Sequence, residues 1–265
     1  PQESDRVART RLEHAMLNLA ELAGIATIEH KLVPVEGLKD PVFMIRRFDR
    51  TPSAQHPGQY ERRGYYSALT ALGLDEARQQ DGSYQGIASV LQRRGRPDVQ
   101  ASQRVELFRR MVLNALINND DDHLRNHGML HCKGTHIELA PAFDLEPRLL
   151  RPGVTTQRRL AIGIGRPAVG KRDSDRDVTV ANLLSDVEPF GLTREEAEMH
   201  LADVAMVVHT NWRECCLQAG MVPDQILALE ETMAYCEQVL DELEGLDAPQ
   251  EAQGDVQPRR QRELA

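Results

Sequence analysis

Cysteine is scarce in this sequence, with four residues in a chain of 265. Cys215 and Cys216 are adjacent, a spacing that fits neither a C-x-x-C motif nor a zinc site, and so few cysteines form no disulfide framework in so long a chain. This scarcity predicts reduced, buried thiols, as in cytoplasmic proteins.

Long apolar runs are also missing. The longest, such as residues 111–113 and 205–208, fall far short of the roughly 18 apolar residues that span a bilayer. Residues 1–11 are polar and lack the apolar stretch of a signal peptide. These absences predict a soluble protein with no visible targeting segment and no membrane partner.

Positive charge is in deficit, with 32 Lys and Arg against 41 Asp and Glu and a formal net charge of -9. The mean field therefore repels nucleic-acid backbones, which argues against general nucleic-acid binding but is compatible with a local basic patch. Lysine is rare, so a catalytic lysine must be Lys31, Lys39, Lys133 or Lys171. The hydrophobic share of 41% suffices for the core of one large domain or two small ones.

The first clear pattern is helical. Leu12, Met16, Leu19 and Ala23 recur every three or four residues and Gly24 follows them, which predicts a helix over residues 7–23. In the first half of the chain we further expect a β-hairpin at 25–35 and 41–48, a loop at 49–64, a helical pattern at 65–74 and a helix at 103–118 capped by Ser102. Short strands are expected at 128–132 and 136–139. Helices should follow over 178–243, with capping signals at Thr193 and Pro223, before a disordered tail at 244–265.

Asparagine and aspartate fill positions 118–122, between an apolar helix and an apolar strand. Alone, such a run is typical of a solvated turn. Asp121 and Asn126, however, have the D-x-x-x-x-N spacing of a kinase catalytic loop, in which the Asp accepts the proton of the attacking hydroxyl and the Asn carbonyl holds magnesium. Asp144 follows the predicted strand pair, so the hairpin can return a second hard-oxygen ligand to Asn126.

Cations in the same loop fit this interpretation. His123, Arg125 and His127 are suited to orient carboxylates or to meet phosphate oxygens. The alternative is a metal-dependent hydrolase, since the two histidines are four residues apart, but a predicted strand follows at once and no helix is left to hold them.

Residues 165–172 fit most of a P-loop pattern. The fit fails where the chemistry needs it, because Arg172 replaces the Ser or Thr that binds magnesium and Pro167 removes an N–H donor. We therefore expect a turn between strands.

The central stretch resembles the signature of the HipA-like serine/threonine kinases. Residues 107–130 read LFRRMVLNALINNDDDHLRNHGML, and residues 139–147 read LAPAFDLEP. MIRRFDR at 44–50 is similar to the hinge-region motif of that family. With RLEHAMLNLAELAGI at 11–25 and the helical block around Trp212, the resemblance extends over roughly residues 6 to 243.

The resemblance implies an α+β fold that is mainly α: a protein-kinase-like C-terminal lobe with a small β-hairpin and hinge remnant of the N-terminal lobe. It divides the chain into a partial N-lobe and hinge at 1–50, a helical lobe at 51–243 and the tail at 244–265. It also implies ATP- and Mg²⁺-dependent transfer of the γ-phosphate to Ser or Thr of a protein substrate.

Carried over position by position, the resemblance implies a role for each residue of the motifs. Asp121 becomes the catalytic base, and Asn126 and Asp144 become the magnesium ligands. The nucleotide-binding residues would be His123, Leu124, Arg125 and Asn126 along the phosphates, Phe143 and Asp144 as the counterpart of a DFG segment, and the backbone of Arg46, Arg47 and Phe48 around the adenine.

HipA-like kinases carry a small lobe upstream of the first helix, with a glycine-containing phosphate loop and a lysine on a strand. That lysine pairs with a glutamate of the helix, and the resemblance makes Glu13 the counterpart of this glutamate. Only residues 1–6 precede that helix in this sequence. We therefore expect either a fragment of a longer kinase or a short form that depends on a partner or has lost activity. The isolated chain should fold but be nearly inactive.

The resemblance further implies a bacterial toxin–antitoxin pair, with a small helix-turn-helix antitoxin as partner. The competing hypothesis is a pseudokinase or regulatory binding module. The missing lysine favours that hypothesis, and the intact Asp121, Asn126 and Asp144 disfavour it.

Overall fold

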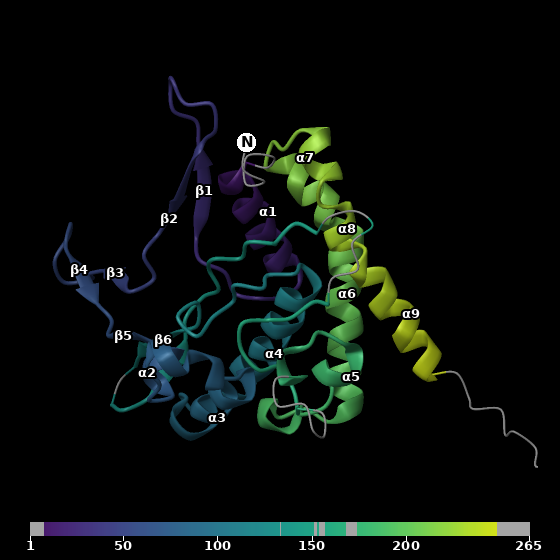
Figure 1. The fold of residues 1–265 in the computed structure, drawn as a ribbon. Coiled ribbons are helices and arrows are strands. Elements are labelled where there is room, and N and C mark those ends of the chain that lie inside the picture. The colour runs from purple at the N-terminus through teal and green to yellow at the C-terminus, as the bar shows by residue number, and fades with distance from the viewer. Residues whose placement is uncertain (1–7, 133, 151–152, 154–156, 168–173, 248–265) are drawn as a thin grey trace, which may run out of the picture.

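A computed structural model describes residues 8–132, 134–150, 153, 157–167 and 174–247 of the chain. Within these residues the architecture is mainly helical with three small antiparallel sheets (Figure 1). The expectation of an α+β fold that is mainly α is confirmed.

Five long helices form the body of the molecule. The longest, α6 (Arg194–Gln218), packs against α1 (Arg9–Leu22), α4 (Gln100–Leu116) and α9 (Tyr235–Asp247), and α3 (Tyr84–Arg94) packs on α4 (Figure 1). Short helical turns connect them: α2 (Ala68–Ala71), α5 (Val180–Leu183), α7 (Pro223–Leu227), α8 (Glu230–Met233) and the 3-10 turns at Glu76–Asp81, Ser174–Arg176 and Glu188–Phe190.

The helices bury the apolar faces that the spacing predicted. Leu12, Met16 and Leu19 of α1 lie in one hydrophobic core with Phe108 of α4 and Trp212 of α6. The start of α6 is fixed by a capping box, in which the Thr193 side chain and Glu196 bond each other's backbone N–H groups. Because these helices pack on one another, the loop that follows α4 is held on a rigid base.

The strands form two projecting hairpins and one sheet in the body. β1 (His30–Val33) pairs with β2 (Val42–Ile45) beside α1, and β3 (Arg50–Pro52) pairs with β4 (Tyr60–Arg62). The β1–β2 hairpin packs on α1 at its base, whereas the β3–β4 hairpin extends away from the helices (Figure 1). The third sheet has the order β5-β6-β7, made of Tyr65–Ser67, Gly128–His131 and Ile137–Leu139. In that sheet Met129 pairs with Leu139, so the strand pair returns the chain toward its start.

Several local predictions were wrong. Residues 49–64 form the β3–β4 hairpin and not a plain loop, and residues 65–67 are strand β5 before the short helix α2. Ser102 lies inside α4, whose N-cap is Val99 without a side-chain bond. Helix α9 continues to Asp247, so residues 244–247 are helical; the rest of the predicted tail lies outside the described residues.

Two predictions about composition can be checked as well. Three of the four free cysteines are buried, whereas Cys132 is half-buried. None of the described helices combines the length and the apolar character needed to cross a membrane.

Candidate active site

The acidic loop begins with a backbone turn that glycine or asparagine favours. Asn118, just beyond the end of α4, has φ of 57°, and the N–H of Asn119 donates to the carbonyl of Asn114 at 2.9 Å. This is a helix ending in which one residue takes the left-handed conformation, and asparagine tolerates it better than most side chains. The chain therefore leaves α4 sharply and enters the loop beside the helix end.

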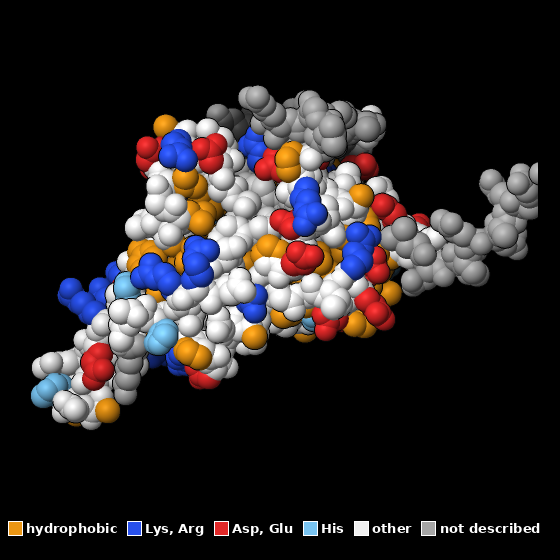
Figure 2. All heavy atoms as spheres, turned by 90° about the horizontal axis from the view of Figure 1, so that it is seen from below, with side chains coloured by type: hydrophobic (Ala, Val, Ile, Leu, Met, Phe, Trp, Pro, Cys, Tyr) orange, Lys and Arg blue, Asp and Glu red, His pale blue; other side chains and the backbone are white. Residues whose placement is uncertain are grey.

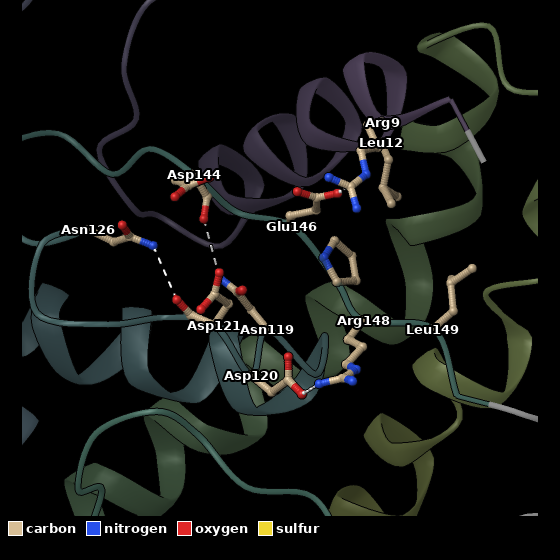
Figure 3. A pocket seen from close by; sticks show the side chains of 11 residues that line it. Arg9, Leu12, Asn119, Asp120, Asp121, Asn126, Asp144, Glu146, Arg148 and Leu149 are labelled. Atoms are coloured by element: carbon tan, nitrogen blue, oxygen red, sulfur yellow. Dashed lines mark hydrogen bonds and ion pairs between the residues drawn. The ribbon is translucent and has the colours of Figure 1, made fainter. Parts of the chain in front are cut away.

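A cleft of about 520 Å³ opens beside this loop (Figure 3). Its lining comes from three places: the start of α1, the loop after α4 and the segment that follows β7. The lining residues are Arg9, Leu12, Asn119, Asp120, Asp121, Asn126, Asp144, Glu146, Pro147, Arg148 and Leu149.

The three residues predicted for catalysis and metal binding all lie on this cleft: Asp121, Asn126 and Asp144. The amide nitrogen of Asn126 donates to the carbonyl of Asp121 at 3.5 Å, and Asp144 lies across the opening from them (Figure 3). Asp144 has φ of 59°, and its carbonyl accepts a bond from the Asn119 amide at 3.4 Å. The segment after β7 is thus tied to the loop after α4, which brings together residues that are far apart in sequence.

The donor set suits a magnesium ion. Because the Asn126 amide nitrogen is engaged with Asp121, its oxygen is left for another partner, and among the described residues the Asp144 carboxylate has no ion pair. Amide and carboxylate oxygens are the ligands that Mg²⁺ prefers. The residues present therefore fit a hard divalent cation.

Negative charge is concentrated around the cleft. Arg9 pairs with Glu146 at 3.2 Å and Arg148 with Asp120 at 2.7 Å, both at the rim (Figure 3). Burial first, and then the charges of Asp144 and Glu146, raise the pKa of Glu13 to about 7. Glu13, which the family resemblance matched to the helix glutamate, thus lies beside Asp144, where a bound cation would relieve the repulsion.

A buried polar network lies beneath the loop. The Asp122 carboxylate, 2% exposed, accepts a hydrogen bond from the Tyr84 hydroxyl of α3 and lies 3.0 Å from Nε2 of His127. The Asn114 amide donates to the same hydroxyl at 2.9 Å, and the Asn119 amide donates to the Asn114 oxygen at 3.0 Å. Because Asn119 also bonds Asp144, the network runs from the acidic loop to the candidate metal ligand.

Sequence reasoning gave Asp122 no role in the kinase interpretation and missed Tyr84. Two adjacent carboxylates in a loop anchored at both ends tend to point in opposite directions, and here Asp121 is exposed while Asp122 is buried. The identity of the buried partner could not be read from local spacing, because Tyr84 is 38 residues away.

Other loop residues predicted to line the phosphates point elsewhere. The Leu124 side chain is fully buried, and a Cβ on Gly82 would come within 2.5 Å of it. Arg125 is exposed and pairs with Glu76. His123 is partly buried, with Nδ1 lacking a partner among the described residues. Of the four residues from His123 to Asn126, only Asn126 lines the cleft.

The predicted hinge is also arranged differently from expectation. The backbone N–H of Arg46 donates to the carbonyl of Glu29 at 2.8 Å, so this group is not free for an adenine. The side chains of Arg46 and Arg47 line a second cavity outside the cleft. Phe48 stacks on Phe143 with ring centroids 5.9 Å apart, which connects the hinge to the residue before Asp144.

The alternatives considered from sequence receive little support. In the part of the chain that the structure describes, no group of three or more His, Cys, Asp and Glu side chains is arranged to hold a metal, and His127 bonds Asp122 rather than pairing with His123. Residues 168–173 of the P-loop-like segment lie outside the described residues.

Comparison with known proteins adds to this geometry. The family model described as the HipA-like C-terminal domain matches residues 2–212. A protein named putative kinase from Haemophilus influenzae is 30% identical over 136 residues, which is 50% of this chain and 39% of that protein. The putative kinase Y4dM of Sinorhizobium fredii is 30% identical over 145 residues, 50% of this chain and 32% of that protein. The chain thus matches well under half the length of these relatives.

Two solved structures share the fold. HipA of Shewanella oneidensis, in a complex with HipB and operator DNA, has a TM-score of 0.63 at 17% identity, over 89% of this chain and 55% of that one. The proinflammatory kinase CtkA of Helicobacter pylori has a TM-score of 0.58 at 12% identity, over 89% of this chain and 83% of that one. The predicted kinase-like lobe is therefore confirmed at the level of the fold.

Proposed function

Because the chain belongs to the family of HipA-like C-terminal domains, we propose that its cleft supports ATP-dependent phosphorylation of Ser or Thr on a protein substrate. The observation that carries this proposal is the convergence of Asp121, Asn126 and Asp144 on one cleft. Relatives named putative kinases and a neighbouring fold that belongs to a kinase support the same class of reaction.

In this proposal Asp121 is the general base. Its carboxylate is exposed on the cleft, where it accepts the proton of the substrate hydroxyl while that oxygen attacks the γ-phosphorus and the bond to the β-phosphate oxygen breaks. The products are the phosphorylated hydroxyl and ADP. Asn126 and Asp144 would hold Mg²⁺, which neutralises phosphate charge when bound.

We propose fewer residues in contact with the adenine and the phosphates than the family resemblance implied. Phe48 and Phe143 offer an apolar stack at the hinge side. Among the residues predicted along the phosphates, Asn126 keeps its role. The proposal leaves out His123, Leu124 and Arg125, because they do not line the cleft. We also propose an antitoxin protein as a partner, because the similar HipA structure contains HipB.

A nucleotide-responsive binding module is the second candidate. The observation that favours it is the lining of the cleft, which contains Arg9 and Arg148 but no lysine within the described residues. A kinase site commonly uses a lysine on the nucleotide phosphates. Such a module would bind the magnesium nucleotide without transferring phosphate.

One set of measurements separates these functions. The chain is titrated with ADP in the presence and absence of Mg²⁺ by calorimetry, and phosphate transfer from labelled ATP to a generic protein substrate and to itself is followed in parallel. Asp121→Asn should abolish transfer and keep Mg²⁺-dependent ADP binding, whereas Asp144→Asn should remove both. Tight Mg²⁺-dependent binding without any transfer, both in this chain and in the chain extended upstream in its reading frame, would favour the binding module. Binding unaffected by Asp144→Asn would show that the site is wrongly assigned.

A further inference from the structure

The β3–β4 hairpin carries a second cavity that the proposed reaction does not use. This cavity, of about 600 Å³, is lined by Arg46, Arg47, Arg50 and Arg62 together with Gly58, Gln59 and Tyr60. It shares no lining residue with the cleft. Figure 2 shows Lys and Arg side chains gathered at the left edge of the molecule, where this hairpin projects.

The hairpin separates its charges between two faces. In the strand register Arg50 lies opposite Arg62 and Pro52 lies opposite Tyr60, so these four side chains share one face. Thr51 and Glu61 face the other side, where the Glu61 carboxylate accepts a bond from the Ser53 hydroxyl at 3.0 Å. Like charges directly opposite in a sheet are unfavourable, and of the two opposed arginines Arg50 is paired with a carboxylate, that of Asp49.

Positive charge exceeds negative charge on this face. Asp49 accepts bonds from Arg47 at 2.8 and 2.7 Å and from Arg50 at 2.8 Å, and Glu29 accepts one from Arg46 at 3.0 Å. Two carboxylates thus form the ion pairs of three arginines. Arg62 is exposed and has no ion pair among the described residues.

The hairpin is also an incomplete sheet. It has two strands, and no other described strand pairs with either outer edge. Its residues are exposed apart from half-buried Arg50, so it has no apolar face to stabilise it. A two-stranded hairpin alone is marginally stable in water, and a third strand supplies backbone hydrogen bonds.

We propose that the arginine face of the β3–β4 hairpin binds an acidic, extended segment of a protein partner. Carboxylates of such a segment would take the bidentate geometry that Asp49 already shows with Arg47. An extended segment places every second side chain on one face, so it can present several carboxylates to the arginines that line the cavity. A single-stranded nucleic acid fits less well, because its bases stack on aromatic rings and Tyr60 is the single aromatic ring in the cavity lining.

The test measures binding of a labelled peptide to the whole chain by fluorescence anisotropy at low salt. The probe is a peptide of about ten residues that alternates Glu and Thr, compared with the same peptide carrying Gln for Glu and with oligothymidylate of equal charge. Arg62→Glu reverses a charge in the cavity, and Arg93→Glu is the matched control, because Arg93 is also exposed and has no ion pair among the described residues.

The proposal predicts that the Glu peptide binds at least about fivefold more tightly than the Gln peptide, and that Arg62→Glu weakens binding by about the same factor. Arg93→Glu should leave binding unchanged, and melting curves should show both variants folded. Equal binding of the two peptides, equal weakening by the two variants, tighter binding of the oligonucleotide, or no binding of the Glu peptide at about 1 mM would each overturn the proposal.

Discussion

The acidic loop at residues 118–127 and the β3–β4 hairpin hold their charged side chains in opposite ways. In the loop, buried Asp122 has specific partners on α3 and in the loop itself, and its neighbour Asp121 is left exposed on the cleft. At the hairpin, Arg46 and Arg47, which are exposed, and half-buried Arg50 share two carboxylates. A buried network fixes geometry because each lost bond leaves an unsatisfied polar group. Exposed ion pairs contribute little to stability and are easily exchanged for other partners.

The largest expected effect separates the two neighbouring carboxylates of the loop. Asp121→Asn should lower phosphate transfer by roughly 10²- to 10⁴-fold, the usual contribution of a positioned base, with little change in stability because the side chain is exposed. Turnover is measured in whichever form transfers phosphate, this chain or the chain extended upstream in its reading frame, beside a urea unfolding curve. Unchanged turnover would remove Asp121 from the role of base.

Removing the buried carboxylate of Asp122 should mainly lower stability, the reverse of the effect expected for Asp121. Asp122→Ala leaves the Tyr84 hydroxyl and Nε2 of His127 without their shared partner, so the free energy of unfolding should fall by ~3 kcal/mol. Tyr84→Phe removes one member of the network and should cost ~1 kcal/mol. Urea unfolding monitored by circular dichroism measures both, and a loss for Asp122→Ala no greater than for Asp121→Ala would contradict the anchoring role.

A smaller effect is expected from the contact between α1 and the other projecting hairpin. His14 and His30 approach at 2.8 Å between their Nδ1 atoms, and burial lowers the pKa of both; the second histidine lowers that of His14 further, while Glu21 acts in the opposite direction. The unfolded chain therefore binds protons more readily. Stability should be full above about pH 6.5 and should fall as the pH drops from there toward the lowered folded pKa values.

This pH dependence can be isolated with a double variant. His14→Gln combined with His30→Gln removes both titrating groups, so its free energy of unfolding should change less than that of the parent between about pH 7.5 and pH 5.5. Guanidinium unfolding curves at the two pH values measure the difference. Identical pH dependence in the two proteins would exclude the histidine pair as its source.

The smallest effect belongs to the arginine-rich hairpin itself. Arg47→Gln removes both bonds to Asp49, yet the Arg47 side chain is 67% exposed, so the melting temperature should not change measurably. The Arg47 guanidinium is also the first cause that holds the pKa of Asp49 below its usual range. That pKa, followed by NMR, should therefore rise toward the ordinary value even though stability does not change.

Much of the fold followed from local patterns in the sequence. The spacing of Leu12, Met16 and Leu19 predicted α1, and the Thr193 capping signal marked the start of α6, because helices need only neighbours three and four residues apart. The predicted strands of the β6–β7 hairpin also formed, because short runs of apolar residues close in sequence pair readily. The β3–β4 hairpin escaped prediction because its residues are polar and exposed, so no alternation of apolar side chains marks its strands.

The candidate site depends both on the sequence and on the tertiary structure. The sequence by itself pointed to Asp121, Asn126 and Asp144, because a D-x-x-x-x-N spacing followed by a further aspartate is typical of a phosphoryl-transfer site. Only the tertiary structure decided that they share one cleft, that Asp122 is buried against Tyr84, and that Leu124 belongs to the core rather than to the site. Such outcomes depend on contacts between segments distant in the chain, and the direction in which a loop side chain points is set by the surface that it meets after folding.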